Sequence, residues 1–94
     1  MSSGQPRYTL TITPTARRQL SERLPESVAF AAYEFIIGPL LDNPYRMGKQ
    51  LHAPLDDRHS ARRGTYRVIY RIDDERRVVT IVDVGHRADV YRQH

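Results

Sequence analysis

The chain has 94 residues and no cysteine, which fits one small domain and excludes a disulfide framework or a thiolate metal site. Its 15 basic and 11 acidic residues give a net charge of +4. No apolar run approaches the roughly 18 residues that a membrane span requires. The first six residues lack the basic and apolar segments of a signal peptide, and we expect them to be disordered. These features predict a single cytoplasmic domain over residues 1–94.

The positive charge is concentrated in the second part of the chain. Residues 1–57 contain six basic and six acidic residues, whereas residues 58–94 contain nine arginines and five acidic residues. Lys49 is the single lysine among the basic residues. Guanidinium groups bind phosphate through two parallel hydrogen bonds, so this asymmetry indicates a polyanion partner. A high-GC genome would explain the arginine-to-lysine ratio, but it explains the asymmetry less well.

The first half of the chain predicts one strand followed by two helices. Residues 8–13 alternate between apolar side chains and threonine, which is typical of a half-buried strand. Thr13-Pro14 provides an N-cap and a first helical residue, so we expect a helix over about 14–23. A second helix is expected over about 25–41, with Gly38-Pro39 kinking it or ending it. The two helices form a hairpin that needs a sheet to cover its apolar faces.

The second half predicts most of that sheet. After a loop at 43–57, we expect strands at about 58–63, 66–73 and 77–85, and a short C-terminal element. Gly64-Thr65 predicts a tight hairpin connection, and residues 73–76 predict a turn. The valine-rich third strand is apolar on both faces, which indicates a central position. The fold class is therefore α+β, with helices on one face of a mostly antiparallel sheet and an open, basic opposite face.

Strand alternation separates the side chains of residues 66–73 into two sets. Tyr66 and Tyr70 belong to the core set, while Arg67 belongs to the open face. The remaining candidates for a site on that face are Arg58, Arg62, His86, Arg87 and Tyr91, with Lys49 as a neighbour. Arginines stabilise a phosphate, and histidine or tyrosine can transfer a proton. Because RNA supplies its own 2′-hydroxyl nucleophile, such a set can cleave it without a metal.

Other kinds of site find little support. His52, His59, His86 and His94 lack metal-ligand spacing, Ser60 lacks a nucleophile elbow, and no glycine-rich phosphate loop is present. We therefore expect no metal and no cofactor. Two of the candidates also have an interpretation without a functional role. An arginine such as Arg62 is more often a solvated surface residue than a ligand-binding one, and a lone histidine such as His86 is more often structural than catalytic.

Two segments resemble the RelE/ParE superfamily of type II toxin–antitoxin toxins. Residues 60–73 with Arg62-x-Gly64-x-Tyr66-Arg67 resemble the strand R-x-G-x-Y-R-x-x-Y, and residues 84–91 resemble a strand that ends in G-[HK]-R before a tyrosine. The Gly48-Lys49-Gln50-Leu51 loop also matches, so the resemblance covers essentially the whole chain and is strongest to the RelE branch.

The resemblance implies a RelE-like microbial RNase fold and a particular function. That function is a toxin that enters the ribosomal A site and acts as an mRNA endonuclease, which inhibits translation and arrests growth. Its expected partners are the ribosome, mRNA and a cognate RelB-like antitoxin, and it would meet operator DNA only within the toxin–antitoxin complex.

The family's functional residues transfer unevenly to this sequence. Arg67 matches the arginine that contacts the scissile phosphate, Arg87 matches a second phosphate-stabilising arginine, and Tyr91 matches the tyrosine that orients the cut nucleotide. Arg58 and Ser60 stand where better-studied members have two lysines. The general base is therefore open among three candidates, with His86 preferred to Lys49 and His59.

Two other functions remain as alternatives. One is a ParE-like inhibitor of DNA gyrase that has the same fold and no catalytic role. The other is a plain nucleic-acid-binding module that uses the basic sheet face. The convergence of arginine, histidine and tyrosine residues favours the nuclease, because an inhibitor needs no acid–base set.

Overall fold

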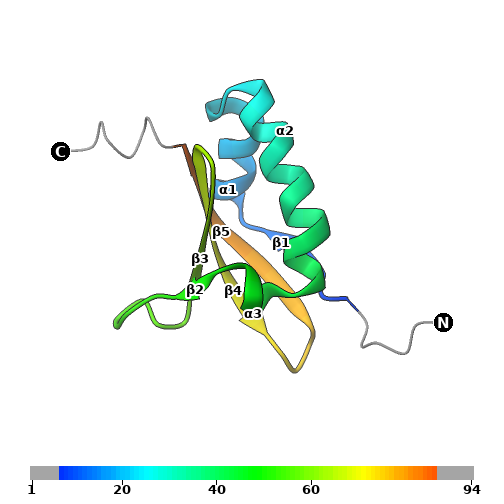
Figure 1. The fold of residues 1–94 in the computed structure, drawn as a ribbon, viewed down its shortest axis with the longest axis vertical. Helices are drawn as coiled ribbons and strands as arrows, with labels where there is room; N and C mark the ends of the chain where they lie inside the picture. The colour runs from blue at the N-terminus through cyan, green and yellow to red at the C-terminus, as the bar shows by residue number, and fades with distance from the viewer. Residues whose placement is uncertain (1–6, 87–94) are drawn as a thin grey trace.

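The computed structural model describes residues 7–86 of the chain, which form one sheet and a set of helical segments (Figure 1). The elements in chain order are β1 (Thr9–Ile12), α1 (Pro14–Arg18), the π-helical segment η1 (Gln19–Arg23), α2 (Glu26–Phe35), the π-helical segment η2 (Ile36–Leu40), α3 (Pro44–Met47), β2 (Lys49–Gln50), β3 (His59–Arg63), β4 (Tyr66–Asp73) and β5 (Val78–His86). No helix in these residues is long and apolar enough to cross a membrane.

The five strands form one sheet in the order β1-β5-β4-β3-β2. β1 is parallel to β5, and every other neighbouring pair is antiparallel. β5 therefore has a partner on each side, as the apolar residues on both of its faces predict. The predicted α+β class and mostly antiparallel sheet are confirmed.

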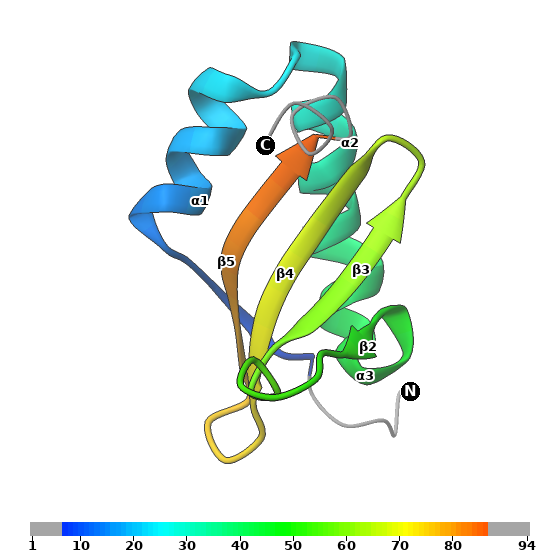
Figure 2. The ribbon, with the colours of Figure 1, turned by 90° about the vertical axis from the view of Figure 1, so that its left-hand side faces the viewer.

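The helical hairpin covers one face of the sheet, and the opposite face carries no helix (Figure 2). Ala32, Phe35 and Ile36 of the second helix are buried, as are Val68 and Tyr70 of β4. Tyr66 and Phe35 are also in contact, with ring centroids 6.5 Å apart. We call the helix-free side of the sheet the open face.

The two hairpin turns follow from local chemistry. Gly64 has a φ of 60°, a left-handed conformation that glycine adopts without strain. At the other turn, the Asp73 carboxylate accepts a hydrogen bond from the backbone N–H of Arg76 at 3.1 Å. Arg77 then takes a φ of 58° before β5 begins. Both connections lie where the sequence predicts them.

The second helix does not end at Gly38-Pro39. Proline lacks an N–H, and the chain accommodates this by widening into η2, which contains Pro39 and continues the helical path. The Arg7 guanidinium donates to the carbonyls of Ile37 and Gly38, and its Nε lies 2.6 Å from a carboxylate oxygen of Asp42. Arg7 thus binds carbonyls that the irregular helix leaves free.

The expectation that residues 43–57 form only a loop is wrong. This segment contains α3 and the two-residue strand β2, which pairs with β3 through Lys49–Ser60 and Gln50–His59. A strand of two residues has no readable alternation, and only its partner identifies it. The other strand boundaries agree with the prediction to within one residue, and the expected element near residues 88–91 lies outside the described residues.

Candidate active site on the open face

The sheet register decides which candidate residues share the open face. Arg62 and Arg67 are directly opposite each other on β3 and β4, and Ser60 is opposite Ile69. Lys49 on β2 is in turn opposite Ser60. Because directly opposite residues project to the same side of a sheet, Lys49, Arg62 and Arg67 all belong to the open face.

Arg67 is a residue of the open face whose guanidinium group is incompletely hydrogen-bonded within the described chain. Its Nε is buried and makes no hydrogen bond with any described residue. Leaving a buried donor unsatisfied costs about 1–3 kcal/mol, and more for a charged group. An anion bound on the open face would satisfy this donor.

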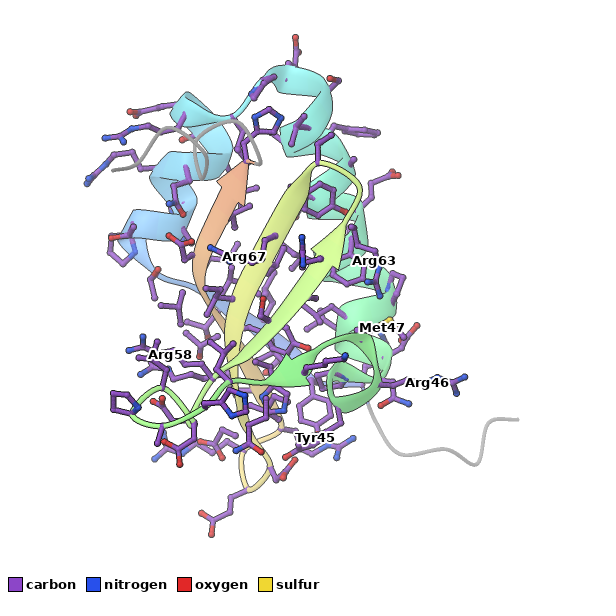
Figure 3. The ribbon with its side chains drawn as sticks, turned by 60° about the vertical axis from the view of Figure 1, so that its left-hand side comes forward. Tyr45, Arg46, Met47, Arg58, Arg63 and Arg67 are labelled. Atoms are coloured by element: carbon purple, nitrogen blue, oxygen red, sulfur yellow. The ribbon has the colours of Figure 1, made fainter. Side chains whose placement is uncertain are left out.

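Arg58 precedes β3 and shows a similar feature. Its Nε is also buried without a hydrogen bond, and it lies 3.7 Å from a carboxylate oxygen of Asp57. That distance allows an ion pair but is too long for a hydrogen bond. Figure 3 shows Arg58 and Arg67 on one side of the strands, with Arg63 on the other side. Two guanidinium groups are therefore incompletely satisfied within the protein.

His86 does not join this set. β5 pairs His86 with Tyr66, and Arg67 is opposite Gly85. Tyr66 packs on the helix side, where its ring contacts Phe35. The side chain of His86 therefore leaves the sheet on the face opposite Arg67, and the expectation that the two meet is wrong. The face of a side chain at the end of a strand depends on the register, which the position in the sequence does not give.

His59 also faces away from Arg67. It is opposite Tyr70, stacks on that ring at 5.6 Å, and meets the Tyr45 ring edge-on at 5.6 Å. Burial lowers the pKa of His59 below its usual value, because the charged form loses hydration. Its contacts make His59 part of the packing between α3 and β4. Arg87 and Tyr91, the two other predicted site residues, lie outside the described residues.

The structure adds Asp83 to the open face. Asp83 is opposite Ile69, while the next pair along β4 is Tyr70 with Ile81, so Val82 forms a β-bulge. The bulge shifts the alternation by one residue, as the burial of Val79, Ile81 and Val84 shows. One Asp83 carboxylate oxygen accepts a hydrogen bond from the Gln19 side chain at 2.8 Å. In the sequence, the apolar residues Ile81 and Val84 are three positions apart, whereas strand alternation gives a spacing of two. This spacing is the sequence signal for the bulge.

Arg63 has a structural role that the sequence did not reveal. Its guanidinium lies 4.6 Å from the centre of the Phe35 ring, and it donates to the carbonyls of Arg62 at 2.7 Å and Met47 at 3.3 Å. β2 pairs only with residues 59 and 60, so this side chain connects β3 to the backbone just before β2. Figure 3 shows Arg63 and Met47 on the same side of the sheet.

No group of three or more metal-binding side chains comes together within residues 7–86. A second surface lies on the helical hairpin instead. A groove of about 510 Å³ between β1 and the helical hairpin has a mostly apolar lining, which also includes Arg17, Ser21 and Glu26. Phe30 and Tyr33 line it and are 63% and 46% exposed. Large exposed aromatic side chains next to a groove are typical of a protein-binding surface. The molecule therefore has a basic sheet face and an apolar helical groove.

Comparisons with known proteins agree with this architecture. The model for the ParE toxin of the parDE type II toxin–antitoxin system matches residues 7–91. Toxin RelE of Mycobacterium tuberculosis (strain ATCC 25618 / H37Rv) is 50% identical over 94 residues, covering 100% of this chain and 95% of the relative. Toxin RelG of the same organism is 51% identical over 86 residues, covering 92% and 98%.

Solved structures show the same fold. The toxin–antitoxin complex RelBE2 (Rv2865-2866) of Mycobacterium tuberculosis has a matching chain with a TM-score of 0.83 and 49% identity, covering 86% of this chain and 99% of that one. The isolated RelE toxin of E. coli matches with a TM-score of 0.68 at 24% identity, covering 89% and 90%, and this likeness concerns the fold alone. The sequence motifs, the sheet order and these relatives lead to one assignment: the chain belongs to the RelE/ParE superfamily of type II toxin–antitoxin toxins, in its RelE branch.

Proposed function

We propose that this toxin is a ribosome-dependent mRNA endonuclease that needs no metal. The 2′-hydroxyl of the mRNA attacks the adjacent phosphate, and arginines on the open face stabilise the charge that develops there. The observation that carries this proposal is the buried Nε of Arg67, which has no hydrogen-bond partner among the described residues. A phosphate oxygen is an acceptor of the right charge for it.

Arg87 and Tyr91 complete the proposed site by their match to the family motif. Arg87 would stabilise the phosphate with Arg67, and Tyr91 would orient the nucleotide that is cut. Arg58, Arg62 and Lys49 would contribute positive charge that binds the RNA backbone, since Arg62 and Lys49 are exposed and have no ion-pair partner within residues 7–86. His86 has no place in the proposed site, because the register directs it to the helix side.

A cognate RelB-like antitoxin is the proposed inhibitor. Relatives of this fold have been solved with their antitoxins, including the RelBE2 complex at 49% identity. The apolar groove beside Phe30 and Tyr33 offers the amphipathic segment of an antitoxin a place to bury its apolar side chains. The complex, rather than the toxin alone, would contact operator DNA.

The test is a purified translation system programmed with a defined mRNA, in which 5′ ends are mapped after the toxin is added. The wild-type protein is expected to cut within the A-site codon, and Arg67→Ala is expected to slow the cut about 10²–10³-fold, as for loss of one transition-state donor. Arg71→Ala is the matched control, because Arg71 is an exposed arginine of the same strand. Equal cleavage by the Arg67→Ala variant and the wild-type protein would refute the site.

A second candidate function follows from the family model, which is that of a ParE toxin. This alternative is a non-catalytic inhibitor of DNA gyrase. A supercoiling assay with the same protein preparation separates the two, because a nuclease leaves gyrase active whereas a ParE-like inhibitor leaves the mRNA intact.

A further inference from the structure

We propose that Lys49 is the catalytic proton donor to the 5′-oxygen that leaves when the RNA is cut. This assignment rests on the proposed nuclease function. Lys49 lies in β2 directly opposite Ser60, on the open face that also carries Arg67. Its side chain is exposed and makes no ion pair or hydrogen bond with residues 7–86.

Several other described residues are less suitable as the proton donor. His86 and His59 project to the helix side, opposite Tyr66 and Tyr70 respectively. Asp83 shares the open face, but Gln19 donates a hydrogen bond to its carboxylate. Arginine keeps its proton under all physiological conditions, so Arg67 stabilises charge without acting as an acid. Among the described residues that the register places on the open face, Lys49 is the one that carries an amine and has no hydrogen-bond partner.

The distance between Lys49 and Arg67 suits two residues that act on one phosphate. The register connects Lys49 to Ser60, Ser60 to Ile69, and Ile69 to Arg67 two residues along β4. Two strand spacings and two residues of rise separate the backbones by about 12 Å. Lysine and arginine side chains are long enough to reach one phosphate placed between two such positions.

Three contacts hold the backbone at Lys49 in place. Gly48 lies so close to β3 that an added Cβ would be 2.7 Å from the carbonyl oxygen of Ser60. The Tyr70 hydroxyl donates to the carbonyl of Pro44 at 2.7 Å, which fixes α3. Arg63 donates to the carbonyl of Met47, two residues before Lys49. A catalytic group needs this kind of support to stay within hydrogen-bond reach of its target.

The reaction balances without a further reagent except water. The 2′-oxygen forms a bond to phosphorus as the bond from phosphorus to the 5′-oxygen breaks, and the 2′-hydroxyl proton passes to a water molecule. The Lys49 ammonium gives its proton to the departing 5′-oxygen, so the products are a 2′,3′-cyclic phosphate and a 5′-hydroxyl. Solvent then returns a proton to the neutral amine. A lysine ammonium carries a transferable proton, so it can act as a general acid in this way.

The experiment compares two mRNAs that differ at the cleaved bond. One is ordinary RNA, and the other carries a sulfur in place of the bridging 5′-oxygen, which leaves as a thiolate without a proton. On ordinary RNA, Lys49→Ala is expected to slow the single-turnover cleavage step about 10²–10⁴-fold. On the sulfur-bridged RNA, the same variant is expected to lie within about tenfold of the wild-type protein, because the leaving group needs no acid.

Two further variants separate proton donation from charge. Lys49→Arg keeps the positive charge and is expected to restore RNA binding but not the rate on ordinary RNA, since guanidinium retains its proton. The double variant Lys49→Ala with Ser60→Lys returns an amine to the same face from the opposite strand. It is expected to recover at least part of the lost rate on ordinary RNA.

The outcomes also distinguish this inference from the proposed function. If the wild-type protein leaves mRNA uncut, the nuclease proposal itself is wrong. If the wild-type protein cuts and Lys49→Ala cuts ordinary RNA at the same rate, the assignment of Lys49 is wrong while the nuclease proposal stands. The assignment is equally wrong if Lys49→Ala loses the same factor on both RNAs, or if Lys49→Arg is as fast as the wild-type protein.

Discussion

Gly48 shows how a single residue decides whether β2 can approach β3. A Cβ at this position would lie 2.5 Å from the Tyr70 hydroxyl and 2.7 Å from the backbone oxygen of Ser60. Neither neighbour can move freely, because Tyr70 is fully buried and its hydroxyl is hydrogen-bonded to Pro44. Glycine is therefore required here because the backbone at residue 48 lies too close to β3 and Tyr70 for a Cβ. Its φ of −145° is one that any residue can adopt.

Gly48→Ala is expected to lower the free energy of unfolding by about 1–3 kcal/mol, the usual cost of overpacking a tight contact. Denaturation by urea, followed by circular dichroism, measures the change. Gly38→Ala is the matched control, because a Cβ at Gly38 would meet no atom within 4 Å. A Gly48→Ala protein as stable as the Gly38→Ala protein would contradict the packing argument.

At the level of elements, Asp74 joins three parts of the chain that are distant in sequence. Its carboxylate accepts hydrogen bonds from the hydroxyl of Tyr8 at 2.6 Å and from the hydroxyl of Tyr45. Tyr8 precedes β1, Tyr45 lies in α3 and Asp74 lies in the turn between β4 and β5. The hydrogen bond to Asp74 raises the pKa of Tyr45 to about 12, and the same bond lowers the pKa of Asp74.

These shifts predict how stability depends on pH. Ionised Tyr45 would lose its hydrogen bond and face a carboxylate, so the contribution of Tyr45 is present below its ordinary pKa of 10.0 and is lost as pH rises to about 12. Asp74 must be ionised to accept well, so its contribution is present above its ordinary pKa of 3.8 and is lost as pH falls through the lowered pKa. Both ranges lie outside neutral pH.

The measurement is the difference in unfolding free energy between the wild-type protein and Tyr45→Phe across the pH range. We expect a constant difference from about pH 4 to pH 10 and a smaller one on either side. A difference that does not change between pH 10 and pH 12 would mean that the hydroxyl does not contribute through Asp74.

The described part of the molecule has two separate surfaces, because the helical hairpin covers one face of the sheet (Figure 2) and Arg62 and Arg67 belong to the other face. The proposed RNA site and the proposed antitoxin groove are thus formed by different side chains. Phe30 is 63% exposed beside the groove, so it can be changed without disturbing the buried core. We therefore expect a change in the proposed groove to reduce antitoxin binding while the proposed RNA cleavage is retained.

Phe30→Glu is expected to weaken antitoxin binding by about 2 kcal/mol or more, which is roughly 30-fold in Kd. Loss of a buried aromatic anchor and burial of a carboxylate both contribute. Isothermal titration calorimetry with the cognate antitoxin measures the change, and mRNA cleavage by the variant is expected to remain normal. Leu55→Glu is the matched control, since Leu55 is 42% exposed and lies outside the groove lining. Equal weakening by both variants would show that the groove is not the docking surface.

The sequence by itself determined most of the elements and the class of fold, but not α3 and β2. Alternation in residues 66–73 and the turn residues around them predicted β4 with its correct ends, and the helical hairpin followed from proline positions and apolar spacing. These signals are local, because each depends on residues that are close in the chain. The same alternation placed Arg67 on the open face, as the register confirms.

The tertiary structure alone decided which side chains share a face at the strand ends. The bulge at Val82 brings Asp83 to the open face, and the pairing of Gly85 with Arg67 directs His86 away from it. β2 exists only through its pairing with β3, which puts Lys49 opposite Ser60. Register and bulges depend on partners that are distant in the chain, and a shift of one residue exchanges the two faces of a strand. The face of Arg67 could therefore be predicted from the sequence, whereas the face of Lys49, the proposed proton donor, required the sheet.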